Sequence, residues 1–402
     1  MKRKFIYLFI TISLFVSGYI MSGCNDTSSS NIISETTTSN ENSSSTIIEA
    51  KNNFYSNPIY PLVNEEKAPT YMADPYVLKA DDGYFYLYCT QTEVYRTDNL
   101  LDGRVFTRGP VFKSTNAVDW KYVSNVFDSY VPDWGTSGAG VWAPTVLKIG
   151  NYYNFYYSLS TGGDSNPGIG VARSETPYGP FEHYGKLFNS EEIGVTNSID
   201  PYVFIDDGKV YMAFGSFGGL ITLIQLSNDG LSLYGGLENQ YNNKVALAGF
   251  EVVATTNYEG TIILKRNGYY YLFLSTGTCC SGANSTYHVV VARSKTLTGP
   301  YLDANNKDMF HPNNGSYVVT PSMSYAMGVG HNGLISDDLG DVWMFYHGYD
   351  VSDSSYNKGW RVPYLDKLLW DNNGFPYVEN YHASNHEIKS GPYLNTLEEG
   401  VN

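Results

Sequence analysis

Apolar residues recur along the chain in short, aromatic-rich runs, each of which follows a turn containing glycine. Five copies of this pattern are present: DDGYFYLYC at 81–89, KIGNYYNFYYS at 148–158, DDGKVYMAFGS at 206–216, KRNGYYYLFLS at 265–275 and DLGDVWMFYHG at 338–348. The central glycines are Gly83, Gly150, Gly208, Gly268 and Gly340. A short strand before each glycine and a longer one after it are typical of a β-hairpin.

Additional strands follow several of the hairpins. GIGVARSETPYGPF at 168–181 and HVVVARSKTLTGPY at 288–301 share Ala-Arg-Ser and Gly-Pro, and both have the composition of strands. Repeated units of about sixty residues with several antiparallel strands predict an all-β fold, a five-bladed β-propeller. Two stacked β-sandwiches do not explain five copies in similar register. We expect one propeller domain over residues 56–385 and a C-terminal tail over 386–402.

Composition supports this interpretation and excludes some classes of partner. Of the 402 residues only 16% are charged, whereas Tyr (37) and Gly (39) are abundant, which favours strands and turns over helices. The net charge of −15 excludes a nucleic-acid partner, because binding phosphates requires a basic surface. We expect a monomer.

The N-terminus has the pattern of an export signal. Residues 2–4 are basic, residues 5–20 are apolar, and Met21-Ser22-Gly23-Cys24 resembles a bacterial lipobox in which Met replaces the usual Leu. We therefore expect a signal peptide over 1–23, a lipid on Cys24 that anchors the protein to a membrane, and a cell-envelope location. An uncleaved anchor helix and plain secretion remain open, and both also predict an exported protein.

Residues 24–55 are rich in Ser, Thr and Asn and have too little apolar surface to fold, so we expect a flexible tether. The other cysteines indicate little about function. Cys89 lies in a strand-like run and is expected to be a packed thiol. Cys279 and Cys280 are adjacent, which leaves a vicinal disulfide open, and no thiolate metal-ligand spacing is present.

Chemically distinctive residues stand at the start of each first strand, eight or nine positions before the glycine. They are Asp74, Trp142, Asp200, Glu259 and His331. Because the first strand of each propeller blade lines the central channel, we expect these side chains to converge around one pocket. Three clustered carboxylates repel one another, a cost that folding alone does not explain. Paired carboxylates are the chemistry of glycoside hydrolysis, in which a protonated acid donates to the leaving oxygen and an ionised base activates water.

The segments ADPYV, WAP, SIDPYVF, the Glu259 segment and GHNG resemble the signature stretches of family 43 glycoside hydrolases, over residues from about 56 to about 380. The resemblance implies a five-bladed propeller that hydrolyses arabinans, arabinoxylans or xylo-oligosaccharides with inversion. It also implies roles for the five residues. These are Asp74 as general base, Glu259 as general acid, Asp200 as the carboxylate that tunes and orients the acid, His331 as a residue that helps to hold a central calcium ion, and Trp142 as a pocket aromatic. Two positions depart from the family pattern: Ala73 stands where many members have His, and Thr261 where many have Pro.

The resemblance favours arabinan as substrate. The stretch STGTCCSGANSTYHVVVARSKTLTGPY is similar to one in α-L-arabinanases, whereas residues 110–127 resemble a segment of exo-acting xylosidases and arabinofuranosidases. We expect an arabinan endo-1,5-α-L-arabinosidase or an α-L-arabinofuranosidase. A β-xylosidase and a non-catalytic glycan-binding lipoprotein are the alternatives. Fructan-cleaving propellers are excluded because their Asn-Asp-Pro-Asn, Arg-Asp-Pro and Glu-Cys boxes are missing. Arg361 is expected either to contact substrate or to form a structural ion pair.

Overall fold

The computed structural model describes residues 53–63, 66–67, 71–95, 104–127, 132–249, 258–311, 313–352 and 360–395. The expected signal peptide, Cys24 and all but the last residues of the expected tether lie outside the described residues. Within the described ranges, no helix is long and apolar enough to cross a membrane.

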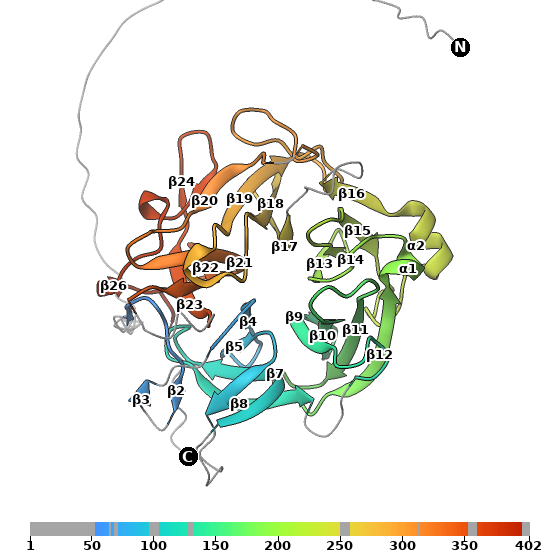
Figure 1. Cartoon of the computed structure of the whole chain (residues 1–402), viewed down its shortest axis with the longest axis horizontal. Coiled ribbons are helices and arrows are strands. Elements are labelled where there is room, and N and C mark those ends of the chain that lie inside the picture. Colours follow the sequence, from blue (N-terminus) through green and yellow to red (C-terminus); the bar gives the residue numbers. More distant parts are fainter. Residues whose placement is uncertain are drawn as a thin grey trace, which may run out of the picture. The chain divides into compact units, whose positions relative to one another are not determined.

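Five of the sheets are blades of antiparallel strands arranged around one centre, where the hairpin repeats predict a channel (Figure 1). The innermost strand of each sheet is the first strand of one repeat. From the channel outward, blade 1 contains β4 (Tyr76–Lys79), β5 (Phe85–Tyr88), β7 (Arg104–Ser114) and β8 (Lys121–Phe127). Blade 2 contains β9 (Gly140–Ile149), β10 (Tyr152–Ser160), β11 (Gly168–Ser174) and β12 (Glu182–Asn189). The prediction of a five-bladed β-propeller is confirmed.

Blades 3 and 4 repeat this arrangement, and blade 5 has three strands. Blade 3 contains β13 (Tyr202–Asp206), β14 (Lys209–Phe214), β15 (Ile221–Gln225) and β16 (Val245–Ala248). Blade 4 contains β17 (Glu259–Arg266), β18 (Tyr269–Thr276), β19 (His288–Ser294) and β20 (Ser316–Val319). Blade 5 contains β21 (Ala326–Ser336), β22 (Val342–Asp350) and β23 (Val362–Lys367).

Short elements decorate the blades. The strands among them are β1 (Phe54–Tyr55), β2 (Leu62–Val63), β3 (Glu66–Lys67), β6 (Thr92–Tyr95), β24 (Leu369–Trp370), β25 (Pro376–Tyr377) and β26 (Lys389–Ser390). The helical turns are α1 (Ser190–Ile193), α2 (Leu237–Asn243), η1 (Gly282–Asn284) and η3 (Glu379–Tyr381). Strands therefore dominate the described chain.

The turn between the first two strands of every blade contains the predicted glycine. All five turn glycines have a left-handed backbone, with φ between 59° and 82°. This conformation is accessible to glycine without the steric cost that a Cβ brings. The glycine therefore marks the same turn in each blade, and counting from it aligns the five blades to within one residue.

Aromatic side chains fill the space between neighbouring blades. Trp343 of β22 is 3% exposed and packs in one buried cluster with Phe85, Leu87 and Phe112 of blade 1. Many of the largest fully buried side chains are tyrosines, such as Tyr86, which also carry a hydroxyl that can meet a polar partner. The high tyrosine content thus reflects inter-blade packing.

The two ends of the described chain pack together beyond the expected domain limits of 56 and 385. β1 pairs antiparallel with β26, and the Tyr393 N–H donates to Asp337 at 3.2 Å. The buried Asn57 side chain joins them to blade 5, because it exchanges hydrogen bonds with the backbone of Leu365 at 2.8 and 2.9 Å. The propeller ring is therefore closed partly by chain-terminal segments that composition alone assigned to a tether and a tail.

The cysteines show two states. Cys279 and Cys280 form a vicinal disulfide in the loop between β18 and β19, the alternative that their spacing left open. Cys89 is a free, fully buried thiol, as predicted.

Candidate active site

A ring of five left-handed residues surrounds one end of the channel. The non-glycine members adopt a backbone that is uncommon for residues with a Cβ. The five are Asp74 (φ 57°), Ala143 (φ 41°), Asp200 (φ 58°), Gly260 (φ 62°) and His331 (φ 50°). Each lies in, or just before, the innermost strand of its blade. The side chains of Asp74, Asp200 and His331 therefore meet, as predicted.

The register differs from the predicted one at two positions. Trp142 and Glu259 each lie one residue before the ring, whose members in their blades are Ala143 and Gly260. Counting from the turn glycine is uncertain by one residue, because irregularities in the β9–β10 and β17–β18 pairing change the number of residues per strand. Glu259 still reaches the site, from the backbone position next to the ring.

A second ring of equivalent residues lies near the end of the second strand of each blade, seven or eight positions after the turn glycine. Its members are Thr90, Ser158, Ser216, Ser275 and His347. In four cases this side chain accepts the backbone N–H of the ring residue of the next blade, at 2.8–3.0 Å. The donor and acceptor pairs are Ala143 to Thr90, Asp200 to Ser158, His331 to Ser275 and Asp74 to His347. These four bonds fix the strained ring residues, and each links one blade to the next.

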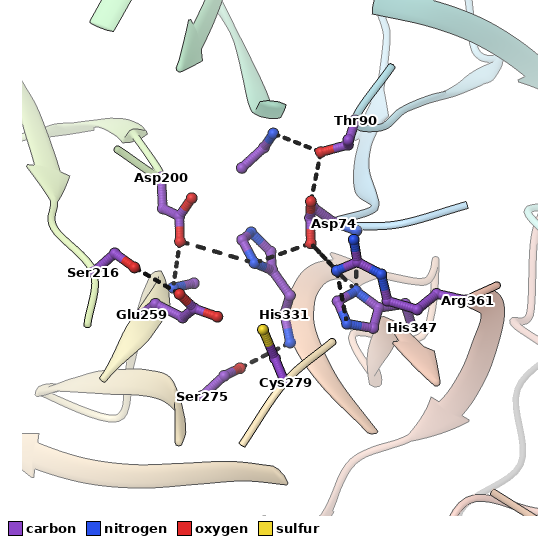
Figure 2. A network of polar contacts seen from close by, with 12 residues as sticks. Asp74, Thr90, Asp200, Ser216, Glu259, Ser275, Cys279, His331, His347 and Arg361 are labelled. Carbon is purple, nitrogen blue, oxygen red and sulfur yellow. Dashed lines mark hydrogen bonds and ion pairs between the residues drawn. The ribbon is translucent and has the colours of Figure 1, made fainter. Parts of the chain in front are cut away.

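Asp74 lies among hydrogen-bond donors and positive charge (Figure 2). Its Oδ2 accepts a hydrogen bond from Thr90 Oγ1 at 2.5 Å, and its Oδ1 lies 3.3 Å from both Arg361 NH1 and His331 Nδ1. Burial by itself raises the pKa of Asp74, but the neighbouring His331 imidazole and the Arg361 guanidinium outweigh it and lower the pKa below its usual range. Asp74 is therefore ionised, the state that a general base requires.

The surroundings of Glu259 and Asp200 raise their pKa values, whereas those of Asp74 lower its pKa. Glu259 accepts hydrogen bonds from Ser216 Oγ at 2.6 Å and from the Tyr287 hydroxyl at 2.7 Å. Burial raises the pKa of Glu259 despite these donors, and burial together with the nearby Glu259 carboxylate raises the pKa of Asp200 well above its usual range. Because the two carboxylates repel each other, they titrate as a pair that retains a proton at a pH where an exposed acid has lost it.

The structure places the two predicted substrate-binding residues differently. Arg361 is paired with Asp74, so the ion-pair alternative is observed. Trp142 is half-buried on β9, and its indole nitrogen lies so close to Gly140 that a Cβ there would come within 2.8 Å. Contact of either side chain with substrate stays a prediction.

A small cavity continues the site into the channel. It is lined by the Asp74, Asp200 and His331 ring residues and by the strand residues that follow them. The side-chain polar atoms of Thr145, Thr261 and Asn332 also line it and are buried without a hydrogen-bond partner among the described residues. Ligand atoms of Asp200, Glu259 and His331 lie within 4.8 Å of one another. Carboxylate, hydroxyl and amide oxygens are the donors that calcium prefers, so this donor set fits the predicted ion.

Four contributing residues escaped the sequence prediction: Thr90, Ser216, Tyr287 and His347. Three of them belong to the second ring, and the same counting from the turn glycines could have found them. Tyr287 follows no repeat position, because it comes from the loop before β19. Only the fold brings its hydroxyl to Glu259.

Comparison with known proteins agrees with this geometry. The family model for glycosyl hydrolases family 43 matches residues 66–376. An extracellular exo-α-(1→5)-L-arabinofuranosidase of Cellvibrio japonicus is 33% identical over 301 residues, which is 68% of this chain and 82% of that protein. An extracellular endo-α-(1→5)-L-arabinanase of Bacillus subtilis is 30% identical over 261 residues, 62% of this chain and 74% of that protein. Among solved structures, the α-L-arabinanase of Cellvibrio cellulosa in complex with arabinohexaose superimposes with a TM-score of 0.65 at 29% identity, covering 77% of this chain and 96% of that one.

Proposed function

The chain belongs to glycosyl hydrolases family 43, and from this premise we propose that it hydrolyses the arabinofuranosyl linkages of arabinan with inversion. The observation that carries the proposal is the electrostatic contrast between two carboxylates in one site. The surroundings of Asp74 lower its pKa, whereas burial raises the pKa of Glu259. A glycosidase needs this division between an ionised base and a protonated acid.

In the proposed mechanism, Asp74 removes a proton from the water that attacks the anomeric carbon. Glu259 donates its proton to the departing glycosidic oxygen in the same step, so the configuration at that carbon inverts. Asp200 keeps Glu259 protonated by charge repulsion and orients the acid segment through the Gly260 N–H. Inversion requires room for water between the two carboxyl groups, about 6.5–9.5 Å.

Arabinan is the proposed substrate because both curated relatives carry α-(1→5)-L-arabinan activities in their names and the solved relative bound arabinohexaose. One relative acts from the chain end and the other within the chain. The length distribution of products from linear arabinan decides between these modes: arabinose or one short oligomer indicates exo action, and a mixture of lengths indicates endo action. Release of xylose from xylo-oligosaccharides would instead support the β-xylosidase alternative.

We also propose calcium at the channel site, held by His331 and the oxygen donors around the cavity. A bound cation would offset the negative charge of ionised carboxylates at the cavity, Asp74 among them. His331 Nδ1 faces the Asp74 carboxylate, which leaves Nε2 as the nitrogen available to a metal. Dialysis against a chelator should lower the melting temperature, and added calcium, rather than magnesium, should restore it.

The protein is proposed to act outside the cytoplasm, as its extracellular relatives do, anchored through a lipid on Cys24 and monomeric. A Cys24→Ala variant should move from the membrane fraction to the soluble fraction. If the unmodified protein in the membrane fraction still carries its N-terminal segment, an uncleaved anchor helix is favoured instead.

The decisive experiment compares two substrates that differ in the leaving group. Glu259→Gln should lose activity on arabinan but keep much of it on an aryl arabinofuranoside with an acidic phenol, because that leaving group needs no proton. Asp74→Asn should lose activity on both substrates, because both need the base. Equal losses for both variants on both substrates would contradict the assigned roles. If unmodified protein binds arabinan and releases no sugar, the glycan-binding alternative is correct.

A further inference from the structure

The second ring contains one exception to its chemistry. Thr90, Ser158, Ser216 and Ser275 are hydroxyl residues, whereas blade 5 has His347. His347 makes the same backbone contact as three of these hydroxyls, since its Nδ1 accepts the N–H of a left-handed residue, Asp74, at 3.0 Å. A serine suffices for this task before Asp200 and His331. The imidazole must therefore provide something else.

The difference lies in the number of protons that each group can donate. A hydroxyl that accepts an N–H still has its own proton to donate. Thr90 shows this in the same site, because it accepts the Ala143 N–H and donates to Asp74 Oδ2. A neutral imidazole that accepts at Nδ1 has its only N–H on Nε2. It can satisfy the backbone without donating at that atom.

The number of protons at position 347 matters because Oδ1 of Asp74 lies nearby. His347 Nδ1 is 3.4 Å from Asp74 Oδ1, so a hydroxyl oxygen placed at Nδ1 would have a carboxylate acceptor close to its proton. Oδ1 already faces Arg361 and His331, and Oδ2 already accepts from Thr90. Another donor would stabilise the carboxylate further and weaken it as a base.

The surroundings of His347 favour the neutral ring. Its side chain is 1% exposed and stacks on the Tyr287 ring, with centroids 5.7 Å apart and planes 10° apart. The charged or titratable groups that face it are Asp74, Arg361, His331 and Tyr287. Arg361 NH1 lies 3.5 Å from Nε2, beyond the normal length of a hydrogen bond, so this contact does not require Nε2 to be an acceptor. Because the Asp74 N–H donates to Nδ1, that nitrogen carries no proton, and a ring with a single proton on Nε2 is neutral.

We propose that His347 is a positioning residue for the base: it holds the Asp74 backbone through an unprotonated Nδ1 and adds no donor to the Asp74 carboxylate. The inference rests on the proposed role of Asp74 as general base. It predicts that the serine used in the other blades cannot replace His347 without loss of catalysis, even though the fold tolerates it.

The first test is His347→Ser, which gives blade 5 the residue of blades 2, 3 and 4. Folding should be retained, with a melting temperature close to that of the unmodified protein. On linear arabinan kcat should fall about tenfold while KM changes less than about twofold, because a general base contributes to the chemical step. His382→Gln, a histidine change outside the site, should leave both constants unchanged. A His347→Ser protein with unchanged kcat would overturn the proposal.

The second test does not depend on activity. ¹⁵N-histidine labelling at pH 7 should show that one of the seven imidazoles is neutral, with its proton on Nε2 and an unprotonated Nδ1. His347→Gln assigns that signal by removing it. A proton on Nδ1, or a positively charged ring, contradicts the proposal. If unmodified protein shows the predicted tautomer but hydrolyses no arabinan, the proposed function fails and the structural assignment of His347 stands.

Discussion

The backbone N–H of Gly260 donates to Oδ2 of Asp200 at 3.3 Å. The residue that follows the proposed acid is thus bound directly to the carboxylate that tunes that acid. A change at Asp200 therefore acts on Glu259 in two ways, through the position of its backbone and through charge repulsion. Both effects are local, since Asp200 and Glu259 lie beside each other in the same polar network (Figure 2).

Asp200→Asn should lower the pKa of Glu259, because the repulsion that favours the protonated acid is removed. The acid must be protonated, so the basic limb of kcat/KM against pH should move to lower pH. At pH 7 activity on arabinan should fall about 100-fold or more, the range that acid catalysis supplies. Asp206→Asn, which breaks an exposed ion pair with Lys265, is the matched control and should leave the profile unchanged. A basic limb that stays in place would contradict the tuning role of Asp200.

Tyr287→Phe should move the same limb in the opposite direction. The Tyr287 hydroxyl donates to Glu259, which stabilises the ionised form and lowers the pKa. Loss of a hydrogen bond to a charged group, about 1.5–3 kcal/mol, corresponds to a shift of about one pH unit or more toward higher pH. The phenyl ring should keep its stacking on His347, so the acidic limb should stay where it is. Tyr317→Phe, at an exposed tyrosine, serves as control.

Gly260→Ala separates backbone strain from crowding of the site. Gly260 has φ +62°, and a Cβ there would lie 3.2 Å from the His331 ring. Gly208 has φ +75° and open space around the same point. Each alanine should destabilise the fold by about 1–2 kcal/mol, the cost of a left-handed residue with a Cβ. Only Gly260→Ala should also lower kcat, because it displaces His331. Equal kcat values for the two variants would contradict a role for this close approach.

Truncation tests whether the chain ends belong to the folded domain. Removal of residues after 395 should leave the melting temperature unchanged. Removal of residues after 385 also deletes β26, which pairs with β1, and Tyr393, which bonds to Asp337. That protein should melt several degrees lower, because Tyr55 and Asn57 lose their contacts with the C-terminal segment. Identical thermal unfolding of the two truncated proteins would favour the shorter domain, 56–385.

The repeats in the sequence were sufficient for the architecture. Each repeat encodes its own turn and its own apolar strands through local preferences, and five copies of one local pattern can close a ring only as a propeller. The same counting brought Asp74, Asp200 and His331 to one end of the channel. These residues are repeat positions, so their convergence follows from symmetry.

Other features depended on contacts between distant segments. A one-residue difference in strand length put Ala143 and Gly260, rather than Trp142 and Glu259, in the left-handed ring. Pairing irregularities of this kind arise from packing between blades, which no single repeat encodes. Arg361 could be assigned to the base only after the fold had placed blade 5 beside blade 1.

The sequence by itself determined the fold class, the three carboxylates and the family, because repeat spacing and short motifs are local properties. The tertiary structure decided the protonation states and their control. The pKa of Asp74 falls through His331 and Arg361, which blade 5 contributes, whereas the pKa of Glu259 in blade 4 rises through burial. Electrostatic interactions depend on distance in space, so only the closed ring could assign one carboxylate as base and another as acid.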